Sequence, residues 1–435
     1  MPAAFAHSRS PRGAWSRLGA FALACLLLAG CWGCSDDGSA AADPQAAAKK
    51  KAEQDQKDKQ DQDRDKPDVE ISRVVPLLSE SLVETSQGQS LALAKPGHWT
   101  AAAQQVKANR DDLEARATVE VLDAKGEPRP LTDTSYRLVS SRPAVLAKGR
   151  QKRIETEVFV PEDLDRFQVA ARLERVSTGS PVGATPPTPW RAMPSYQYFF
   201  IVLAKDPAQY SFLKVADAVR APHEDEGGRF ALHYRVVLAD GDQPPPLPAS
   251  VLQWTSVAHL WWDEANVDRL SPEQQTALVD WLHWGGRLAI NGPDSLDKLR
   301  GTFLDPYLPA ESGKTREFTV DDLAPLNKAW TLRDATGQPR DLLRPVKPWS
   351  GVELKVRPGA AETPGTGGLL VERSVGSGGI VVSAVQLAQR ELLNWPAYDS
   401  FLNGALLRRP PRKFRMEDSD FLSGLEADWI GFKGR

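Results

Sequence analysis

The feature that most constrains the fold is a run of seven apolar residues, YFFIVLA, at Tyr198–Ala204. A continuous apolar run predicts a strand buried on both faces, which is typical of parallel sheets covered by helices. Asp206 and Pro207 come next, as the N-cap and first residue of a predicted helix. The apolar residues of that helix are Tyr210, Leu213 and Val215. Two more strands are expected over Leu232–Ala239 and Val257–Trp262.

The clearest helix signal begins at Ser271 and ends at Gly285-Gly286. Ser271 and Gln274 form the pattern of a capping box, and a glycine pair is a common helix stop. The next strand is expected over Arg287–Asn291. Ser295 is then expected to be the N-cap of a short helix.

Later strands at Gly368–Arg373 and Gly379–Ala384 flank the turn Ser374–Gly378, which predicts a hairpin. Trp395–Leu407 is expected to form one final helix. Because strands and helices alternate, residues 195–407 are predicted to form an open, mostly parallel α/β sheet.

Residues 69–194 carry a different pattern, in which apolar and polar residues alternate between spaced turns. This pattern predicts an antiparallel β-sandwich-like domain. Its strands are expected over Thr118–Leu122, Tyr136–Val139, Ile154–Val160 and Phe167–Leu173. In Ile154–Val160, the even-numbered residues should share one face of the sheet. The proline-rich stretch Ser180–Pro194 is expected to be a domain boundary.

The block Val257–Ser295 resembles the class I glutamine amidotransferase-like superfamily. The shared features are an apolar strand ending in an acidic residue, a Ser-Pro-Glu-Gln-Gln helix ending in Trp-Gly-Gly, a short strand and a Gly-Pro turn. The late hairpin, with its Gly-Ser-Gly-Gly tip before Ile380–Val382, also fits. The resemblance implies a flavodoxin-like or amidotransferase-like sheet. It also implies a place for a Cys nucleophile, on the turn after the short strand, with a downstream His and acid.

That catalytic pair is missing from the sequence. The matching turn, Asn291–Ser295, has no Cys, and no His follows His283. A Cys–His pair is therefore impossible, and the family's amidotransferase chemistry is excluded. Ser295 is a poor substitute nucleophile, because His259 lies mid-strand between apolar residues and His283 lies on the polar flank of a helix. We predict no catalytic residue, metal site or cofactor.

Polar residues at two strand ends are the candidates for a ligand site. Asp263 and Glu264 follow one predicted strand, and Asp294 and Ser295 follow the next. Open α/β sheets bind ligands at the carboxyl ends of their strands, so these four residues are the candidate ligand-binding residues. Paired carboxylates there can bind a cation or act as acid and base. The simpler alternative is a solvated strand end or a cap for the next segment.

Three further groups have simpler explanations. The consecutive residues His223–Glu226 cannot all converge on one ion, so a solvated acidic loop is expected. Ser377–Gly379 is too short for a phosphate-binding loop and is expected to be a hairpin tip. The tryptophans at 261–262 and 281–284 are expected in the core, with the first two on opposite faces of their strand.

Residues 1–31 have the pattern of an export signal. Basic residues precede an apolar run, Leu18–Gly30, which is too short to span a bilayer comfortably but typical of a signal-peptide core. The run ends in Leu-Ala-Gly-Cys31, which resembles the bacterial lipobox. The resemblance implies acylation of Cys31 and anchoring to membrane lipid in the cell envelope. The alternative is an ordinary signal peptide or an uncleaved anchor with Cys31 incidental.

Cysteine usage and composition characterise the chain beyond the leader. No cysteine follows Cys34, so the folded part has no disulfide and no thiolate site. Cys34 is either a second acylation site or a free thiol. Residues 32–68 are rich in Ala, Lys, Gln and Asp, which predicts a disordered tether of roughly 30 Å. Contact of Lys49–Lys51 with anionic lipid is the alternative.

The remaining features concern location and partners. Trp32, rather than Asp, follows the lipobox cysteine, which favours the outer membrane over the outer face of the inner membrane. The net charge of −3 gives no sign of a nucleic-acid partner. Residues 408–435 begin with RRPPRKFR and contain no evident element. This predicts a longer protein or a tail that docks on an envelope partner, with a frayed terminus as the alternative.

Two classes of function fit these observations. The first is a lipid-anchored envelope protein whose α/β domain is a non-catalytic binding or scaffold module. The second is an envelope hydrolase or metal-dependent enzyme that uses acidic residues at the strand ends. The second requires Asp263, Glu264, Asp294 and a histidine to surround one open cleft.

Overall fold

The computed structural model describes residues 67–78, 92–131, 133–216, 233–332 and 338–409, and the backbone of two strands, β20 (Arg412–Met416) and β21 (Leu425–Trp429). The leader, Cys31, Cys34, nearly all of the tether and His223–Glu226 lie outside the described residues. Within the described part of the chain, no helix has the length and apolar character needed to cross a membrane.

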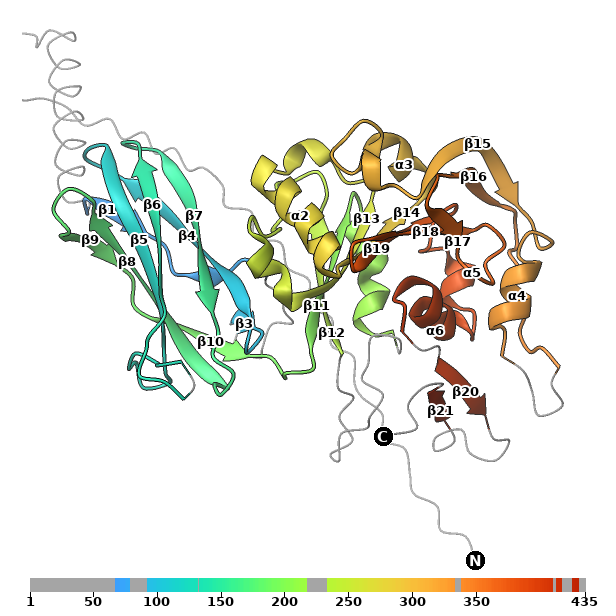
Figure 1. Ribbon diagram of the computed structural model, residues 1–435, viewed down its shortest axis with the longest axis horizontal. Coiled ribbons are helices and arrows are strands. Elements are labelled where there is room, and N and C mark those ends of the chain that lie inside the picture. Colours follow the sequence, from blue (N-terminus) through green and yellow to red (C-terminus); the bar gives the residue numbers. More distant parts are fainter. Residues whose placement is uncertain are drawn as a thin grey trace, which may run out of the picture. The chain divides into compact units, whose positions relative to one another are not determined.

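Two sheets of mostly antiparallel strands form the first region (Figure 1). The four-stranded sheet contains β1 (Val69–Ile71), β2 (Val75–Pro76), β4 (Trp99–Ala108) and β7 (Gln151–Phe159). The six-stranded sheet contains β3 (Ala92–Ala94), β5 (Leu113–Leu122), β6 (Val139–Leu146), β8 (Arg166–Arg175), β9 (Pro181–Ala184) and β10 (Thr188–Ala192). Ala102 and Val158 of the first sheet share a buried cluster with Val119 and Val169 of the second. The two sheets therefore enclose a common core.

The alternation expected in Ile154–Val160 is confirmed, because all its even-numbered residues are buried. Two expectations for this region were wrong. β3 and β10 pair in parallel, so the six-stranded sheet is mixed. The strand expected over Tyr136–Val139 begins only at Val139. The proline-rich stretch Ser180–Pro194 contains β9 and β10, and the next strand, β11, belongs to a different sheet. Pro181 is tolerated because it is the first residue of its strand.

The second region is built on a seven-stranded sheet with the order β12-β11-β13-β14-β19-β18-β17. Its strands are β11 (Tyr198–Ala204), β12 (Tyr234–Asp240), β13 (Val257–Asp263), β14 (Arg287–Asn291), β17 (Ala360–Glu362), β18 (Leu370–Val375) and β19 (Gly378–Ser383). β12, β11, β13, β14 and β19 pair in parallel, whereas β18 pairs antiparallel with β19 and β17 pairs antiparallel with β18. The region is therefore mixed α/β with a mostly parallel sheet.

Both faces of this sheet are covered, which explains the continuous apolar runs. Phe199, Ile201 and Leu203 of β11 join one buried cluster, and Phe200 and Val202 join the other. The first face packs against η3 (Val251–Ser256), α2 (Pro272–Trp284) and α3 (Pro293–Leu299). The second packs against η1 (Pro207–Lys214), α4 (Ala324–Trp330), α5 (Arg390–Leu393), α6 (Tyr398–Phe401) and the π-helical turn η6 (Leu402–Leu406). The remaining elements are η4 (Val267–Arg269), η5 (Asp305–Tyr307) and the antiparallel pair β15 (Ala310–Phe318) and β16 (Trp349–Val356).

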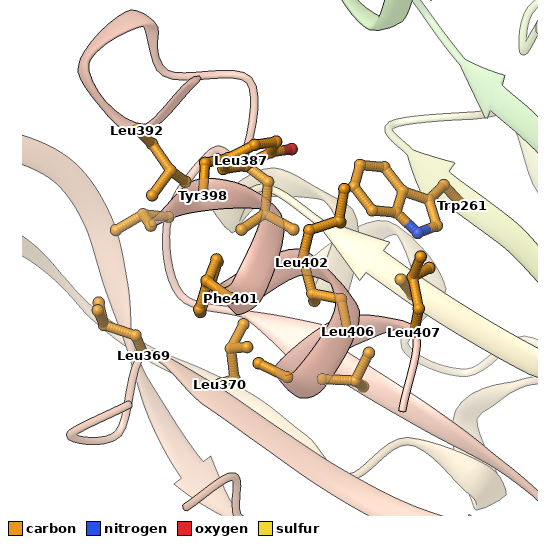
Figure 2. Close-up of a cluster of buried hydrophobic side chains, with 14 of the residues drawn as sticks. Trp261, Leu369, Leu370, Leu387, Leu392, Tyr398, Phe401, Leu402, Leu406 and Leu407 are labelled. Carbon is orange, nitrogen blue, oxygen red and sulfur yellow. The ribbon is translucent and has the colours of Figure 1, made fainter. Parts of the chain in front are cut away.

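Trp261 and Trp262 face opposite sides of β13, as expected. Figure 2 shows Trp261 in the cluster formed with the leucines of the final helical segment. The helix expected over Trp395–Leu407 begins only at Tyr398, where α6 continues directly into η6, and the separate short helix α5 precedes it. Pro396 lies in the break between α5 and α6, where it cannot donate a helical hydrogen bond.

The ends of α2 confirm the capping prediction. Ser271 Oγ accepts from the Gln274 amide, and Gln274 Oε1 accepts from the Ser271 amide. Gly285 has a φ of 125°, a value that L side chains rarely adopt. Two details differ from expectation: Trp284 is exposed, and α3 begins after Gly292, so Ser295 lies inside the helix rather than at its N-cap.

The expected hairpin is confirmed, and its tip rests against α2. The Ser377 amide donates to the His283 carbonyl oxygen at 3.0 Å. A Cβ at Gly378 would lie 2.2 Å from the Leu282 carbonyl oxygen, so only glycine permits this approach. β20 and β21 pair as an antiparallel ladder, so the tail does contain an element that its sequence did not suggest.

Candidate functional site

Four polar side chains meet at the carboxyl edge of the parallel sheet. Asp263 ends β13 and Asn291 ends β14. Tyr210 comes from η1, which follows β11, and Gln386 follows β19. Four of the five parallel strands, β11, β13, β14 and β19, thus each end at or lead to one member of a cluster that we call the carboxyl-edge cluster.

The members of this cluster hydrogen-bond to one another. Asp263 Oδ2 accepts from the Tyr210 hydroxyl at 2.6 Å and from Gln386 Nε2 at 3.0 Å. Asn291 Nδ2 donates to the Tyr210 hydroxyl oxygen and to Gln386 Oε1. Asn291 Oδ1 accepts from the Leu387 amide at 2.8 Å. Asn291 and Tyr210 are fully buried, Asp263 is 6% exposed and Gln386 is half-buried, so most of the network lies beneath the surface.

Burial governs the electrostatics of the cluster. Desolvation raises the pKa of Asp263, although hydrogen bonds from Tyr210 and Gln386 act in the opposite direction. Desolvation and the nearby Asp263 raise the pKa of Tyr210. Asp263 Oδ1 is buried without a partner among the described residues, and a Cβ at Gly292 would lie 3.1 Å from it. A side chain at position 292 would therefore crowd this oxygen, and glycine leaves the space beside it clear.

The other three candidate residues lie near Asp263 but have different partners. Glu264 has a φ of 53° and directs its carboxylate to Lys298, with an Nζ–Oε2 distance of 2.6 Å. Ser295 Oγ donates to the Asn291 carbonyl oxygen at 2.6 Å and accepts from the Glu264 amide at 2.8 Å. Asp294 is exposed at the start of α3. Ser295 therefore joins two strand ends structurally, and the expectation of a solvated strand end was wrong for the buried Asp263.

The histidines do not complete the candidate site. His259 is buried and forms a 3.1 Å hydrogen bond between Nε2 and the Tyr234 hydroxyl, as expected for a core histidine. Burial, with smaller effects from Arg409, Arg287 and His233, lowers the pKa of His259 to about 3. His283 is exposed near the end of α2. In the described ranges, no group of three His, Cys, Asp or Glu residues could hold a metal ion.

A second polar site, which sequence reasoning missed, lies at the opposite edge of the sheet. A cavity of about 390 Å³ opens beside the first residues of β14 and β19. Its charged lining residues are Arg287, Glu372, Arg373 and Arg408, and Leu288, Ile380 and Leu406 are among its apolar ones. Only Arg408 belongs to a recognisable sequence feature, the basic run at the start of the tail. We call this cavity the amino-edge pocket.

Comparisons with known proteins give no family for the chain. No protein-family model and no curated protein matches it. A Niemann-Pick type C2 protein from Japanese carpenter ant is 9% identical over 28% of this chain and 91% of its own, with a TM-score of 0.20. The C-terminal domain of wzt is 8% identical over 30% and 76%, with a TM-score of 0.22. The exo-β-1,4-mannosidase Op5Man5 from Opitutaceae bacterium strain TAV5 is 16% identical over 48% and 36%, with a TM-score of 0.26. Scores of this size do not establish a shared fold.

Proposed function

We propose that this protein is a lipid-anchored lipoprotein of the cell envelope whose α/β region is a non-catalytic binding or scaffold module. The anchor is acylated Cys31, and the partners are membrane lipid and other envelope proteins. The outer membrane is the favoured location. The observation that carries the non-catalytic part is the carboxyl-edge cluster, which fills the place where a related enzyme would bind its substrate.

We also propose a flavodoxin-like or amidotransferase-like arrangement for the sheet. In chain order, the five parallel strands β12-β11-β13-β14-β19 are numbered 2-1-3-4-5 across the sheet, which is the order of flavodoxin-like folds. Such folds bind ligands where the strand order reverses, between the first and third strands. Here Tyr210 follows the first strand and Asp263 ends the third, and they hydrogen-bond to each other. The crevice expected at this point is therefore occupied by the protein's own side chains.

The alternative, an envelope hydrolase or metal-dependent enzyme, has less support. It needs several titratable groups around one open cleft. Asp263 is buried and hydrogen-bonded, Glu264 is paired with Lys298, and Asp294 is exposed. His259 bonds to Tyr234 and not to any of these carboxylates. The arrangement is that of a structural network rather than an acid–base pair.

An activity screen of the purified full-length protein tests the non-catalytic part. We expect no ammonia release from glutamine and no hydrolysis of activated esters or phosphate esters, with or without added Mg²⁺ or Zn²⁺. Any turnover is to be checked in Asp263→Asn, with the exposed Asp294→Asn as matched control. Turnover that Asp263→Asn abolishes and Asp294→Asn preserves would establish the enzyme alternative and contradict the proposal.

Metabolic labelling with a palmitate analogue tests the anchor. The wild-type chain should be labelled and should sediment with membranes. Cys31→Ala should lose both properties, and Cys34→Ala serves as the matched control three residues away. If Cys31→Ala keeps the label, the double variant Cys31→Ala/Cys34→Ala decides whether Cys34 is the acceptor. Labelling of the double variant would contradict the lipoprotein assignment.

A further inference from the structure

The amino-edge pocket differs from the carboxyl-edge cluster because it encloses open volume and its lining has excess positive charge. Three arginines and one glutamate are its only ionisable lining residues. Its volume of about 390 Å³ falls within the range of small-molecule sites. Leu288, Ile380 and Leu406 give part of the wall an apolar character. A few polar groups converging on a partly apolar hollow are typical of ligand pockets.

Among the described residues that line the pocket, positive charges outnumber negative ones. Arg408 pairs with Glu372, and Arg373 Nη1 donates to the Pro306 carbonyl oxygen at 2.8 Å. Arg287 is half-buried, and its guanidinium has no hydrogen-bond or ion-pair partner among the described residues. Within this lining, Glu372 is the sole carboxylate beside three guanidinium groups.

Arg287 and Arg408 line the same cavity, and two further observations describe their surroundings. Burial and the positive charge of Arg287 lower the pKa of Arg408, as expected for like charges that share a hollow. Arg287 pairs in register with Gly379, and a Cβ at Gly379 would lie 2.9 Å from Arg287 Nη1. The absence of a side chain at Gly379 thus leaves space for the guanidinium of Arg287.

We propose that the amino-edge pocket binds an oxyanion, a carboxylate or phosphate group carried by a small organic molecule, through Arg287 and Arg408. Guanidinium groups present paired donors that match the oxygens of both anions. The apolar wall formed by Leu288, Ile380 and Leu406 takes the uncharged part of the molecule. The site lies away from the strand ends where open α/β sheets bind ligands. It depends on neither the lipid anchor nor the absence of catalysis.

Isothermal titration of the full-length protein in neutral detergent at low ionic strength tests this inference. The probes are inorganic phosphate and succinate, with glycerol as the uncharged control. We expect saturable binding of at least one anion and none of glycerol. Arg287→Gln should weaken that binding by about tenfold or more, because it removes a charged hydrogen-bond donor. Arg300→Gln, at the exposed Arg300–Asp297 pair, should leave it unchanged.

Glu372→Gln should have the opposite effect on the affinity for the anion. It removes the carboxylate that competes for Arg408, so it should tighten anion binding, a gain that a damaged fold cannot produce. The proposal is overturned if neither anion binds saturably to the wild type. It is also overturned if Arg287→Gln binds as the wild type does, or if Glu372→Gln fails to bind more tightly.

A final arm distinguishes the source of the oxyanion. The titration is repeated in micelles that contain phosphatidylglycerol. If this lipid competes with the soluble probe in the wild type, the anion is a lipid headgroup. If the lipid has no effect, the anion belongs to a free solute. Both outcomes keep Arg287 and Arg408 as the binding groups.

Discussion

Polar side chains have opposite environments at the carboxyl edge and the amino edge of the seven-stranded sheet, where its parallel strands end and begin. At the carboxyl edge, the buried Tyr210, Asp263 and Asn291 form a hydrogen-bond network with the half-buried Gln386. At the amino edge, Arg287 has no partner in the described part of the chain and borders a cavity. The first edge uses its hydrogen-bonding capacity for stability, whereas the second leaves capacity free for a ligand.

This difference teaches that strand topology alone does not locate a ligand site. Open α/β sheets place ligands at their carboxyl edge because strand-to-helix turns diverge there. In this chain the side chains at or after the ends of β11, β13, β14 and β19 hydrogen-bond to one another. An unpartnered charged group that borders a cavity, as Arg287 does, indicates where a ligand is expected better than the position of the edge.

The largest expected effect is a difference in the free energy of unfolding between variants at the two edges. Asp263→Ala removes the acceptor of Tyr210 and of Gln386, and we expect it to lower the free energy of unfolding by about 3 kcal/mol. Arg287→Gln should change this quantity by less than about 0.5 kcal/mol, because no described contact is lost. Urea unfolding at pH 7 measures both. Equal costs at the two positions would remove the contrast between the edges.

His259 is expected to give a somewhat smaller effect, visible in acid. Its pKa in the folded state is about 3, below the ordinary value, so the unfolded chain takes up this proton first as pH falls. Its contribution to stability is complete above pH 6.5 and is lost between there and pH 3. We expect a loss of about 2 kcal/mol between pH 7.5 and pH 5. The loss should be absent in His259→Gln, whose amide can still bond to Tyr234; a similar loss in both proteins would assign it to other groups.

Asp263 should show a pH dependence of the opposite sign. Burial raises its pKa in the folded state, so the stability it contributes is complete below its ordinary pKa and declines as pH rises through the folded-state value. Each unit of difference corresponds to about 1.4 kcal/mol. The Asp263→Asn variant cannot ionise at this position. Its free energy of unfolding relative to that of the wild type should therefore be higher at pH 7 than at pH 4. Unfolding titrations at these two pH values measure the change, and the reverse order would show that hydrogen bonding outweighs burial.

The smallest expected effect concerns the surface of the carboxyl edge. Lys298→Ala breaks the ion pair with Glu264, in which both side chains are partly exposed. Such pairs contribute about 0–1 kcal/mol, so the melting temperature should fall by no more than a few degrees. Scanning calorimetry at low and high salt measures this, with a weaker salt dependence expected in the variant, in which Lys205 Nζ remains 3.8 Å from Glu264 Oε2. A cost as large as that of Asp263→Ala would show that Glu264 belongs to the buried network.

Local signals predicted much of the sheet and its best helix. β11 and β14 occupy the residues expected because their apolar runs are short, continuous and bounded by turn residues. The bounds of α2 follow from Ser271, Gln274 and Gly285, whose contacts span only a few residues. β4 was missed because its sequence, WTAAAQQVKA, has little apolar volume and its alanines become buried only when the facing sheet is present.

The two sites could not be predicted to the same depth. The sequence placed Asp263 at a strand end, but its bond to Gln386 joins residues 123 positions apart and depends on the whole sheet. The error on Ser295 has a similar origin, because its hydroxyl bonds to the ends of β13 and β14 instead of its own helix terminus. The amino-edge pocket combines Arg287, Glu372 and Arg408, which share no local pattern.

The position of β19 has a consequence for how the chain folds. This strand lies between β14 and β18, yet residues 292–377 separate it from β14 in sequence. The β18–β19 hairpin is local and can form early, whereas its docking onto β14 must close a long loop. We therefore expect assembly of the sheet centre to be the slow step, during which the apolar flank of β14 stays open. A chain released in that interval is at its most aggregation-prone.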